Sequence, residues 1–477
     1  MILLPHMKGK TVAVLGLGRT GLSAVRSLTA SGARVFAWDD SEAARARLMR
    51  ETNLGATPPV EWQWPLMAAL VLSPGIPFTH PEPHELVREA QAANVPVISD
   101  MELFVQTLGE KGARTAPVIA VTGTNGKSTT SALIHHILRR AGYAAQLGGN
   151  IGKPVLELDP PAYKPAYVLE VSSYQIDLTP SLAPEVGVLL NITPDHLDRH
   201  GGLAGYAAAK RRLFKGQWPE DIAIVGIDDQ LSADICAELK LLHREGRGAR
   251  VVPIAIGRTL GRGVFVAGGR LVDAGSDPAI EIADLRECAT LRGAHNWQNA
   301  AAAYAASRSI GGQPGAIADG LMTFPGLAHR QELVCQWENI SFINDSKATN
   351  ADAAVKALSS FDNIYWIAGG RPKDGGLDAA MDALAGVRKA YLIGEAAGDF
   401  AKALDGKVAS VNAGTLEKAV ALATQDARAT GTAQAVVLLS PACASFDQFT
   451  DYEARGEAFR TLAKALVRIY STEGVAQ

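Results

Sequence analysis

Short runs of β-branched and other apolar residues alternate along this chain with alanine-rich amphipathic stretches. A short apolar run between turn residues is typical of a buried strand, and an apolar stripe at helical spacing is typical of a helix packed on a core. Regular alternation of the two is expected of parallel sheets flanked by helices. The pattern therefore predicts an α/β protein.

The alternation falls into three blocks. The first opens with KTVAVLGLGRTGLSAVRSL and ends near residue 108, where the polar segment TLGEKGARTAP follows. The second includes GVFVAGGRLVD, which we interpret as a hairpin with a two-residue turn at Gly268 and Gly269. The third follows FPGLAHR and contains the strand-like runs NIYWIAGG, KAYLIG and AVVLLSP. We expect three domains, residues 1–108, 109–326 and 327–477.

Length and charge narrow the class of protein. A chain of 477 residues is too long for one ordinary core, and its net charge of -3 leaves no basic excess for nucleic acid or anionic lipid. No uncharged apolar stretch is long enough to span a membrane. The apolar run at the beginning of the sequence is too short for a signal peptide. We expect a cytoplasmic protein that binds small molecules, without nucleic-acid binding or membrane insertion. The scattered cysteines show no metal-site or disulfide spacing: Cys236, Cys288, Cys335 and Cys443.

The segment VIAVTGTNGKSTTSAL, residues 118–133, combines an apolar run, a glycine turn and a helix start. A phosphate-binding loop needs inward backbone N–H groups, a lysine for the terminal phosphates and a hydroxyl for magnesium. Gly123, Gly126, Lys127 and Ser128 supply these parts, although Val121 stands where the strict pattern has glycine. A plain glycine turn is the alternative. We expect ATP as the ligand.

The first block carries a second glycine loop, Gly16-x-Gly18-x-x-Gly21, with Asp39 about twenty residues later. This is the dinucleotide fingerprint, in which the acidic residue contacts a ribose hydroxyl. The same geometry accepts a UDP-linked substrate, and a structural turn is the third interpretation. The segment LSPGIP, residues 72–77, could line the same crevice.

Acidic and histidine side chains follow two apolar runs of the second block. Glu170 ends the run AYVLE, where a carboxylate beside a phosphate loop commonly ligates magnesium, although a solvent-facing strand end is the alternative. Two aspartates and two histidines then fall within six residues of the segment NITPDHLDRHG. This segment could equally be the start of a capped polar helix. Histidine is an unusual magnesium ligand, since hard cations prefer oxygen. These residues are Asp195, His196, Asp198 and His200.

Motifs in all three blocks together resemble the Mur ligases of bacterial peptidoglycan synthesis. They are TGTNGKST, LEVSSYQ, NITPDHLDRH, YAAAKRRLF, GAHNWQNAAAA, HRQE, NDSKATN and LLSPACASFDQF. The resemblance implies an N-terminal Rossmann-like domain for a UDP-sugar, a central P-loop ATPase domain with a mainly parallel sheet, and a C-terminal Rossmann-like domain for an amino acid. It also implies an ATP-dependent amide ligase that joins D-glutamate to UDP-N-acetylmuramoyl-L-alanine through an acyl phosphate and releases ADP and phosphate. ATP, two magnesium ions and a monomeric chain belong to this expectation.

The family pattern also assigns roles to positions of this chain. The expected catalytic residues are Lys127, Glu170, His196, Lys210 and Lys347. The expected metal ligands are Ser128, Glu170, His196 and Lys210, the last as a carbamate, whereas from the sequence alone Lys210 is an ordinary surface-helix lysine. The expected ATP-binding residues are Gly123, Thr124, Asn125, Gly126, Lys127, Ser128, Thr129, Asn296, Asn299, Arg330 and Asp345.

Substrate contacts follow from the same resemblance. The expected UDP-substrate residues are Arg19, Thr20, Asp39, Asp40, Ser73, Gly75, Asn150 and His196. The expected D-glutamate residues are Thr349, Lys373, Ser445 and the backbone at Tyr452. Two departures from the family occur: a related chain has phenylalanine at the position of Tyr452, and GGRPKDGG differs in the spacing around Lys373.

Other functions remain open at this stage. An NAD-dependent oxidoreductase would use the first glycine loop but would leave the phosphate loop and Glu170 without a role. A folate polyglutamate ligase shares the chemistry but lacks a Rossmann-like domain at the front. A non-catalytic nucleotide switch would bind ATP without any amino-acid dependence. Cys443 has no histidine in its motif, so we expect a small buried packing residue there.

Overall fold

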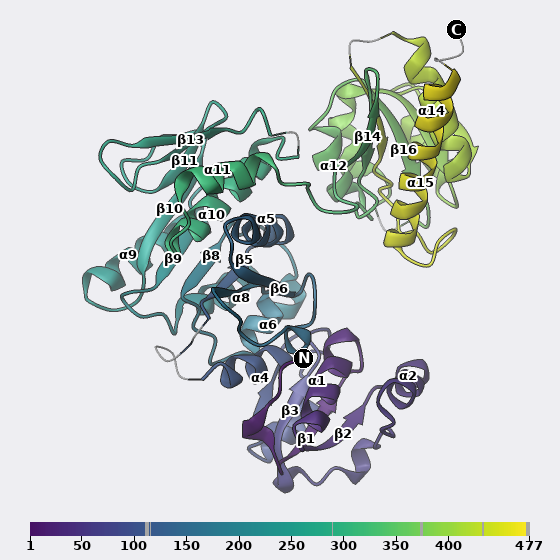
Figure 1. Ribbon diagram of the computed structural model, residues 1–477. Helices are drawn as coiled ribbons and strands as arrows, with labels where there is room; N and C mark the ends of the chain where they lie inside the picture. Colours follow the sequence, from purple (N-terminus) through teal and green to yellow (C-terminus); the bar gives the residue numbers. More distant parts are fainter. Residues whose placement is uncertain (110–113, 115, 289, 373–374, 432–433, 474–477) are drawn as a thin grey trace. The chain divides into compact units, whose positions relative to one another are not determined.

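The computed structural model describes residues 1–109, 114, 116–288, 290–372, 375–431 and 434–473. It contains three sheets, in which most neighbouring strands are parallel (Figure 1). The chain divides into two compact units, residues 1–324 and 325–477, and the first unit holds two of the sheets. The predicted α/β class is confirmed. Within the described segments, no helix has both the length and the apolar character that a membrane crossing requires.

The first sheet has four parallel strands in the order β2-β1-β3-β4. Along β1, Val12 and Val14 are buried in one core cluster with apolar residues of helices α1 and α4, whereas Ala13 and Leu15 are buried in another with residues of α3. Burial on both faces explains the continuous apolar run of this strand. The elements are β1 (Thr11–Leu15), α1 (Arg19–Ala30), β2 (Arg34–Trp38), α2 (Glu42–Thr52), β3 (Met67–Leu72), α3 (Glu85–Ala92), β4 (Val97–Ile98) and α4 (Asp100–Thr107).

The second sheet has nine strands in the order β13-β12-β11-β10-β9-β8-β5-β7-β6. Helices α5 and α10 lie side by side on it (Figure 1). Its strands are β5 (Val118–Thr122), β6 (Ala144–Gly149), β7 (Pro165–Glu170), β8 (Val186–Leu189), β9 (Ile222–Gly226), β10 (Arg250–Ile256), β11 (Val264–Ala267), β12 (Arg270–Asp273) and β13 (Ile280–Asp284). Its helices are α5 (Lys127–Arg140), α6 (Ser173–Asp177), α7 (Leu197–His200), α8 (Leu203–Arg211), α9 (Gln230–Arg244), α10 (Ala294–Ser309) and α11 (Pro314–Met322).

The predicted hairpin of the second block is confirmed. Strands β11 and β12 are antiparallel, and Ala267 stands opposite Arg270 across the turn. Gly268 and Gly269 both have positive φ, 56° and 83°, which a two-residue turn of this kind requires at both positions.

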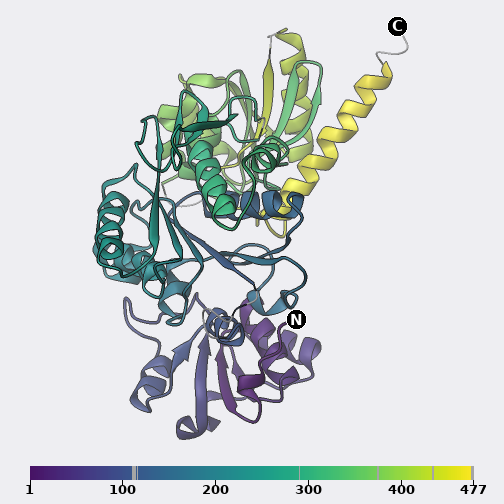
Figure 2. The ribbon, with the colours of Figure 1, turned by 60° about the vertical axis from the view of Figure 1, so that its left-hand side comes forward.

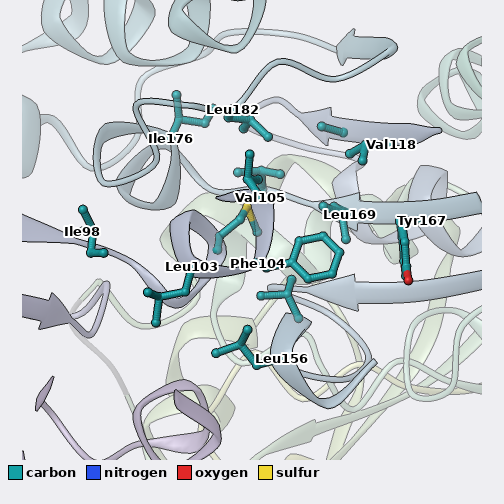
Figure 3. Close-up of a cluster of buried hydrophobic side chains, with 14 of the residues drawn as sticks. Ile98, Leu103, Phe104, Val105, Val118, Leu156, Tyr167, Leu169, Ile176 and Leu182 are labelled. Atoms are coloured by element: carbon teal, nitrogen blue, oxygen red, sulfur yellow. The ribbon is translucent and has the colours of Figure 1, made fainter. Parts of the chain in front are cut away.

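The first two sheets share one apolar core. Figure 3 shows Leu103, Phe104 and Val105 of α4 among side chains of the second sheet. The ring of Phe104 meets that of Tyr167 edge to face, with centroids 5.1 Å apart. Residues 1–108 and the second sheet therefore belong to one compact unit that runs through residue 324. Whether residues 1–108 form a separate domain stays a prediction.

The third sheet, in the second unit, has the order β14-β15-β19-β16-β17-β18, and only the β14–β15 pair is antiparallel. Trp366 on β16 is buried in one cluster with residues of α12 and α13, and its neighbour Tyr365 in another with residues of α14 and α15. Figure 2 shows α15 as a long helix. The elements are β14 (Glu332–Trp337), β15 (Ile340–Asn344), α12 (Ala351–Leu358), β16 (Ile364–Gly369), β17 (Val387–Ile393), α13 (Ala397–Leu404), β18 (Ser410–Gly414), α14 (Leu416–Ala429), β19 (Ala435–Leu439) and α15 (Tyr452–Glu473).

Candidate active site

The glycine loop between β5 and α5 places backbone N–H groups at the start of a long helix. Gly126 precedes α5 with φ +83°, a conformation that favours glycine. A Cβ at this position would lie 2.2 Å from Asn299 Oδ1, so a side chain has no room there. The helix N-terminus, with the N–H groups of its first turn, forms an anion-binding site of the kind that holds phosphate.

Two asparagines from neighbouring elements hold this loop in place. Asn191, after β8, accepts hydrogen bonds from the backbone N–H groups of Thr124 and Asn125, both at 2.9 Å. Asn299 on α10 accepts one from Thr130 Oγ1 at 3.2 Å. No role of Asn191 was expected from the sequence, although its place at the end of a strand beside β5 is a signal that could have indicated one. Ser128 and Thr129 lie in the first turn of α5, and Asn296 bonds Asn299 at 3.1 Å.

Two lysines converge on one carbonyl of the loop. Lys127 Nζ donates to the carbonyl oxygens of Gly123 and Thr124 at 2.9 and 2.8 Å, and Lys210 Nζ donates to that of Gly123 at 2.9 Å. Lys210 is only 1% exposed and lies 4.4 Å from the ring centroid of Tyr206. Burial, followed by the charge of Lys127, lowers the pKa of Lys210 to about 7. The sequence alone indicated a surface lysine; the structure buries it beside the loop.

Glu170 ends β7 next to β5, as predicted, and is buried at 1% exposure. Its Oε1 accepts a hydrogen bond from Asn150 Nδ2 at 2.7 Å, whereas its Oε2 has no hydrogen-bond partner among the described residues. A buried carboxylate oxygen without a donor is costly unless a cation faces it. The solvent-facing alternative is therefore wrong, and the site fits a divalent cation with oxygen ligands. No cluster of three or more His, Cys, Asp or Glu side chains suited to a metal occurs in the described segments.

The two histidines of NITPDHLDRHG have different environments. His196, at the start of α7, has φ +52° and a half-exposed side chain, with its ring 5.2 Å from that of Tyr174. His200 is buried; its Nε2 lies 2.9 Å from Ser173 Oγ and its Nδ1 lies 3.6 Å from an Asp177 oxygen. Burial, then the charge of Lys210, lowers the pKa of His200 to about 4, so it is neutral at pH 7. A polar helix does start here, at Leu197, as the alternative held, but no side chain caps it, so the capping part of that alternative is wrong.

The expected UDP-substrate residues of the first block follow the carboxyl ends of parallel strands, where ligands of such sheets bind. Asp39, after β2, accepts backbone N–H bonds from Leu17 at 2.7 Å and Ser41 at 2.9 Å. Ser73, after β3, donates to the Gly16 carbonyl at 3.0 Å. These contacts fix the first glycine loop. Asp40 accepts a bond from the indole of Trp38, and Thr20 lies in the first turn of α1.

Hydrogen bonds connect the loops at this end of the first sheet to segments next to the second sheet within the same unit. Arg19 Nη2 donates to the carbonyl oxygen of Gly152 at 2.8 Å. Arg199 Nη1 donates to that of Gly75 at 3.1 Å. Asn150 lies between Gly149 of β6 and Gly152 and bonds Glu170. The expected UDP-substrate residues and the orphan carboxylate oxygen therefore share one neighbourhood.

The second unit brings together the remaining expected residues. Asp345 is 5% exposed, and its carboxylate accepts bonds from Gln331 N at 3.1 Å and Ser440 Oγ at 2.8 Å. Burial raises the pKa of Asp345 to about 7, against the nearby charge of Arg330. Cys443 is fully buried, as expected.

The residues expected to bind the amino acid lie on the loops after β15 and β19 and, for Tyr452, at the first position of α15. Lys347 Nζ is 5.6 Å from the ring centroid of Tyr452, and the carbonyl of Tyr452 accepts a hydrogen bond from Ser346 Oγ at 2.8 Å. Ser445 is 2% exposed, and Thr349 lies just before α12. Lys373 lies outside the described residues.

The fold and the loop define a P-loop nucleotide-binding α/β protein whose phosphate site adjoins a buried carboxylate. Three family models match the chain: the Mur ligase MurD-like N-terminal domain over residues 10–99, the Mur ligase middle domain over 121–254 and the Mur ligase glutamate ligase domain over 329–443. The chain belongs to the Mur ligase family.

Relatives that share one name match nearly the whole chain. The UDP-N-acetylmuramoylalanine--D-glutamate ligase of Caulobacter sp. strain K31 is 52% identical over 467 residues, 98% of each chain. That of Phenylobacterium zucineum is 50% identical over 467 residues, also 98% of each. The solved UDP-N-acetylmuramate-alanine ligase of Thermotoga maritima matches 95% of this chain and 99% of its own with a TM-score of 0.56 and 17% identity. That likeness supports the fold.

Proposed function

We propose that this chain joins D-glutamate to UDP-N-acetylmuramoyl-L-alanine at the expense of ATP, in the synthesis of peptidoglycan precursors. The observation that carries this is the identity of about one half, over 98% of the chain, to ligases of that name. The phosphate loop and the buried Glu170 supply the chemistry that such a ligase needs.

The reaction has two steps. An oxygen of the alanyl carboxylate attacks the γ-phosphorus of ATP, the bond to ADP breaks, and an acyl phosphate forms. The neutral amine of D-glutamate then attacks the acyl carbon, phosphate leaves, and the amine gives up a proton. Both steps bring anions together, so positioning and charge neutralisation are the main catalytic tasks.

Residues of the first unit would bind ATP and the magnesium ions. Lys127 and the N–H groups of Gly123 to Thr129, at the start of α5, would hold the ATP phosphates. Asn296 and Asn299 would lie near the adenine. Ser128, Glu170 and His196 would hold two magnesium ions, which offset the repulsion between carboxylate and phosphate when bound. The orphan Oε2 of Glu170 supports this assignment.

Lys210 would complete the metal site as a carbamate. Its lowered pKa provides a neutral amine near pH 7, and only a neutral amine attacks dissolved CO2. The nitrogen forms a bond to the carbon and loses a proton to solvent, which converts a buried cation into an anionic oxygen ligand. The adduct also removes the repulsion between Lys210 and Lys127.

Residues of the second unit would bind the amino acid and part of ATP. Arg330 and Asp345 contact the ATP phosphates and ribose, and Lys347 lies by the phosphoryl group. Thr349 and Lys373 contact the side-chain carboxylate of D-glutamate, and Ser445 and the backbone at Tyr452 contact its α-carboxylate. The contacts of Lys347 and Ser346, on the loop after β15, with Tyr452 at the start of α15 support this.

The test is phosphate release from ATP and magnesium with UDP-N-acetylmuramoyl-L-alanine present and D-glutamate, L-glutamate, L-lysine or no amino acid added. Release that requires both the UDP-substrate and D-glutamate supports the proposal. Release without an amino acid indicates a nucleotide switch and contradicts it. We further propose that the chain acts as a cytoplasmic monomer, and sedimentation during turnover tests its oligomeric state.

A further inference from the structure

Arg455, near the start of α15, carries a positive charge inside the second unit. It is 1% exposed. Its Nε donates to Ser346 Oγ at 3.0 Å, and its Nη2 donates to the carbonyls of Ser346 and Cys443 at 2.9 and 3.1 Å. Its Nη1 donates to the carbonyl of Ala444 at 3.3 Å. The guanidinium therefore clamps two loops that follow β15 and β19.

Every acceptor of Arg455 in the described part of the chain is neutral. Asp447 acts on it electrostatically but forms no hydrogen bond with it among the described residues, and accepts one from the N–H of Glu395 instead. Arg460 on the same helix differs, because it pairs with Glu332 at 2.6 Å and Glu457 at 3.4 Å. A buried cation without an anionic partner is costly, and an anion that arrives nearby recovers part of that cost.

The loop that Arg455 holds presents donors on its other side. The Ala444 carbonyl points at Arg455, and in a planar trans peptide the N–H of the next residue, Ser445, points the opposite way. Neither the N–H nor the hydroxyl of Ser445 has a hydrogen-bond partner within the residues described, although the residue is 2% exposed. The N–H and hydroxyl of Ser445, with the positive charge of Arg455 behind the same peptide group, are suited to bind a carboxylate.

We propose that Arg455 is a positioning residue that orients the Ser445 loop and supplies the positive charge for the α-carboxylate of the amino-acid substrate. This inference rests on the proposed function, in which Ser445 binds that carboxylate. Arg455 acts through one peptide group and does not itself touch the substrate. Its charge matters as well as its hydrogen bonds, and this separates the role from packing.

The test compares Arg455→Gln, which keeps donors but loses the charge, with Arg455→Lys, which keeps the charge. Arg460→Gln is the matched control, because that arginine already has carboxylate partners. We expect Arg455→Gln to raise the KM for D-glutamate about 10- to 100-fold, with the KM for ATP changed by less than about twofold. Arg455→Lys should recover most of the affinity near pH 7. The preference for D-glutamate over its α-amide should also fall in Arg455→Gln.

A second readout does not depend on the glutamine variant folding. A buried lysine has a lowered pKa, so in Arg455→Lys the KM for D-glutamate should rise between pH 7 and 9, more than in the wild type. Unchanged D-glutamate KM values in Arg455→Gln, or a flat pH profile in Arg455→Lys when Arg455→Gln does not fold, would overturn the inference. Wild-type protein without D-glutamate-dependent phosphate release would instead refute the proposed function.

Discussion

Lys210 Nζ donates a hydrogen bond to the carbonyl oxygen of Gly123 over 2.9 Å, so helix α8 is tied directly to the phosphate loop. Lys127 Nζ donates to the same oxygen at 2.9 Å. Two cations on one carbonyl repel each other, and this is one cause of the lowered pKa of Lys210. The arrangement therefore favours loss of a proton, and with it the positive charge, from Lys210.

We expect Lys210→Ala to lower the rate of phosphate release by about 100-fold or more, because the carbamate would be missing from the metal site. Added short carboxylates should restore part of the rate, since they can enter the space and replace the carbamate oxygens. Steady-state rates with and without acetate measure this. Full activity without acetate would mean that Lys210 is structural.

Carbamylation should depend on pH. The neutral amine fraction of Lys210 rises as the pH passes through about 7, so the adduct should increase between pH 6 and 8. The ¹³C spectrum of protein equilibrated with ¹³C-labelled bicarbonate should show a carbamate signal that grows over this range. Lys210→Arg is the control and should lack the signal. A signal of constant size from pH 6 to 8 would contradict the assignment.

Lys127→Ala tests the phosphate loop. We expect phosphate release to fall by about 100-fold or more, because the terminal phosphates lose their cation. Binding of UDP-N-acetylmuramoyl-L-alanine, measured by calorimetry, should stay within about twofold, since the first glycine loop holds that substrate. Turnover near the wild-type rate would refute the loop assignment.

Gly126 and Gly142 form a matched pair for the loop geometry. Their φ values are +83° and +84°, but a Cβ at Gly126 meets Asn299 Oδ1 at 2.2 Å, whereas one at Gly142 meets nothing within 4 Å. Both alanine variants place an L-residue at a left-handed φ, which costs about 1–2 kcal/mol. Gly126→Ala should also raise the KM for ATP at least about tenfold, and Gly142→Ala should not. Equal ATP KM values in the two variants would show that the contact with Asn299 is unimportant.

We expect Asp345→Asn to lower the rate of phosphate release and to raise the thermal stability of the protein. The carboxyl titrates at about 7 in the folded protein against a usual 3.8, so the folded state binds more protons between these values. Its contribution to the free energy of unfolding therefore falls as the pH rises through this window. We expect Asp345→Asn to raise the Tm at pH 8 by about 2 °C or more, to raise it less at pH 5, and to slow phosphate release. Equal Tm differences at the two pH values would contradict this.

The fold could be predicted from the sequence where local chemistry decides it. The apolar run before Gly123 and the glycine pair at residues 268 and 269 each restrict the backbone by themselves. The alternation of runs then indicated parallel sheets. The sharing of a core by α4 and the second sheet was not foreseen, because it depends on contacts between residues such as Phe104 and Tyr167 that are distant in the chain.

The residue types of the site could be predicted from the sequence, but the burial and hydrogen-bond partners of those residues could not. Glu170 is recognisable as a candidate ligand, yet nothing local shows that Asn150 satisfies one oxygen and leaves the other without a partner. His196 and His200 are four residues apart, but only packing against Ser173 and Asp177 separates a half-exposed ring from a buried one. Arg455 resembles any helix arginine until the loops that it clamps are seen.

The edge-to-face contact of Phe104 and Tyr167 has a consequence for how the protein can be cut. A fragment that began at residue 109 would expose the apolar surface that α4 covers, and one that ended at residue 108 would carry the complementary bare surface. Such exposed patches favour aggregation. We therefore expect a fragment of residues 1–324 to aggregate less than one that begins at residue 109, and a gene fusion or split reporter to be tolerated best at residue 324 or 325.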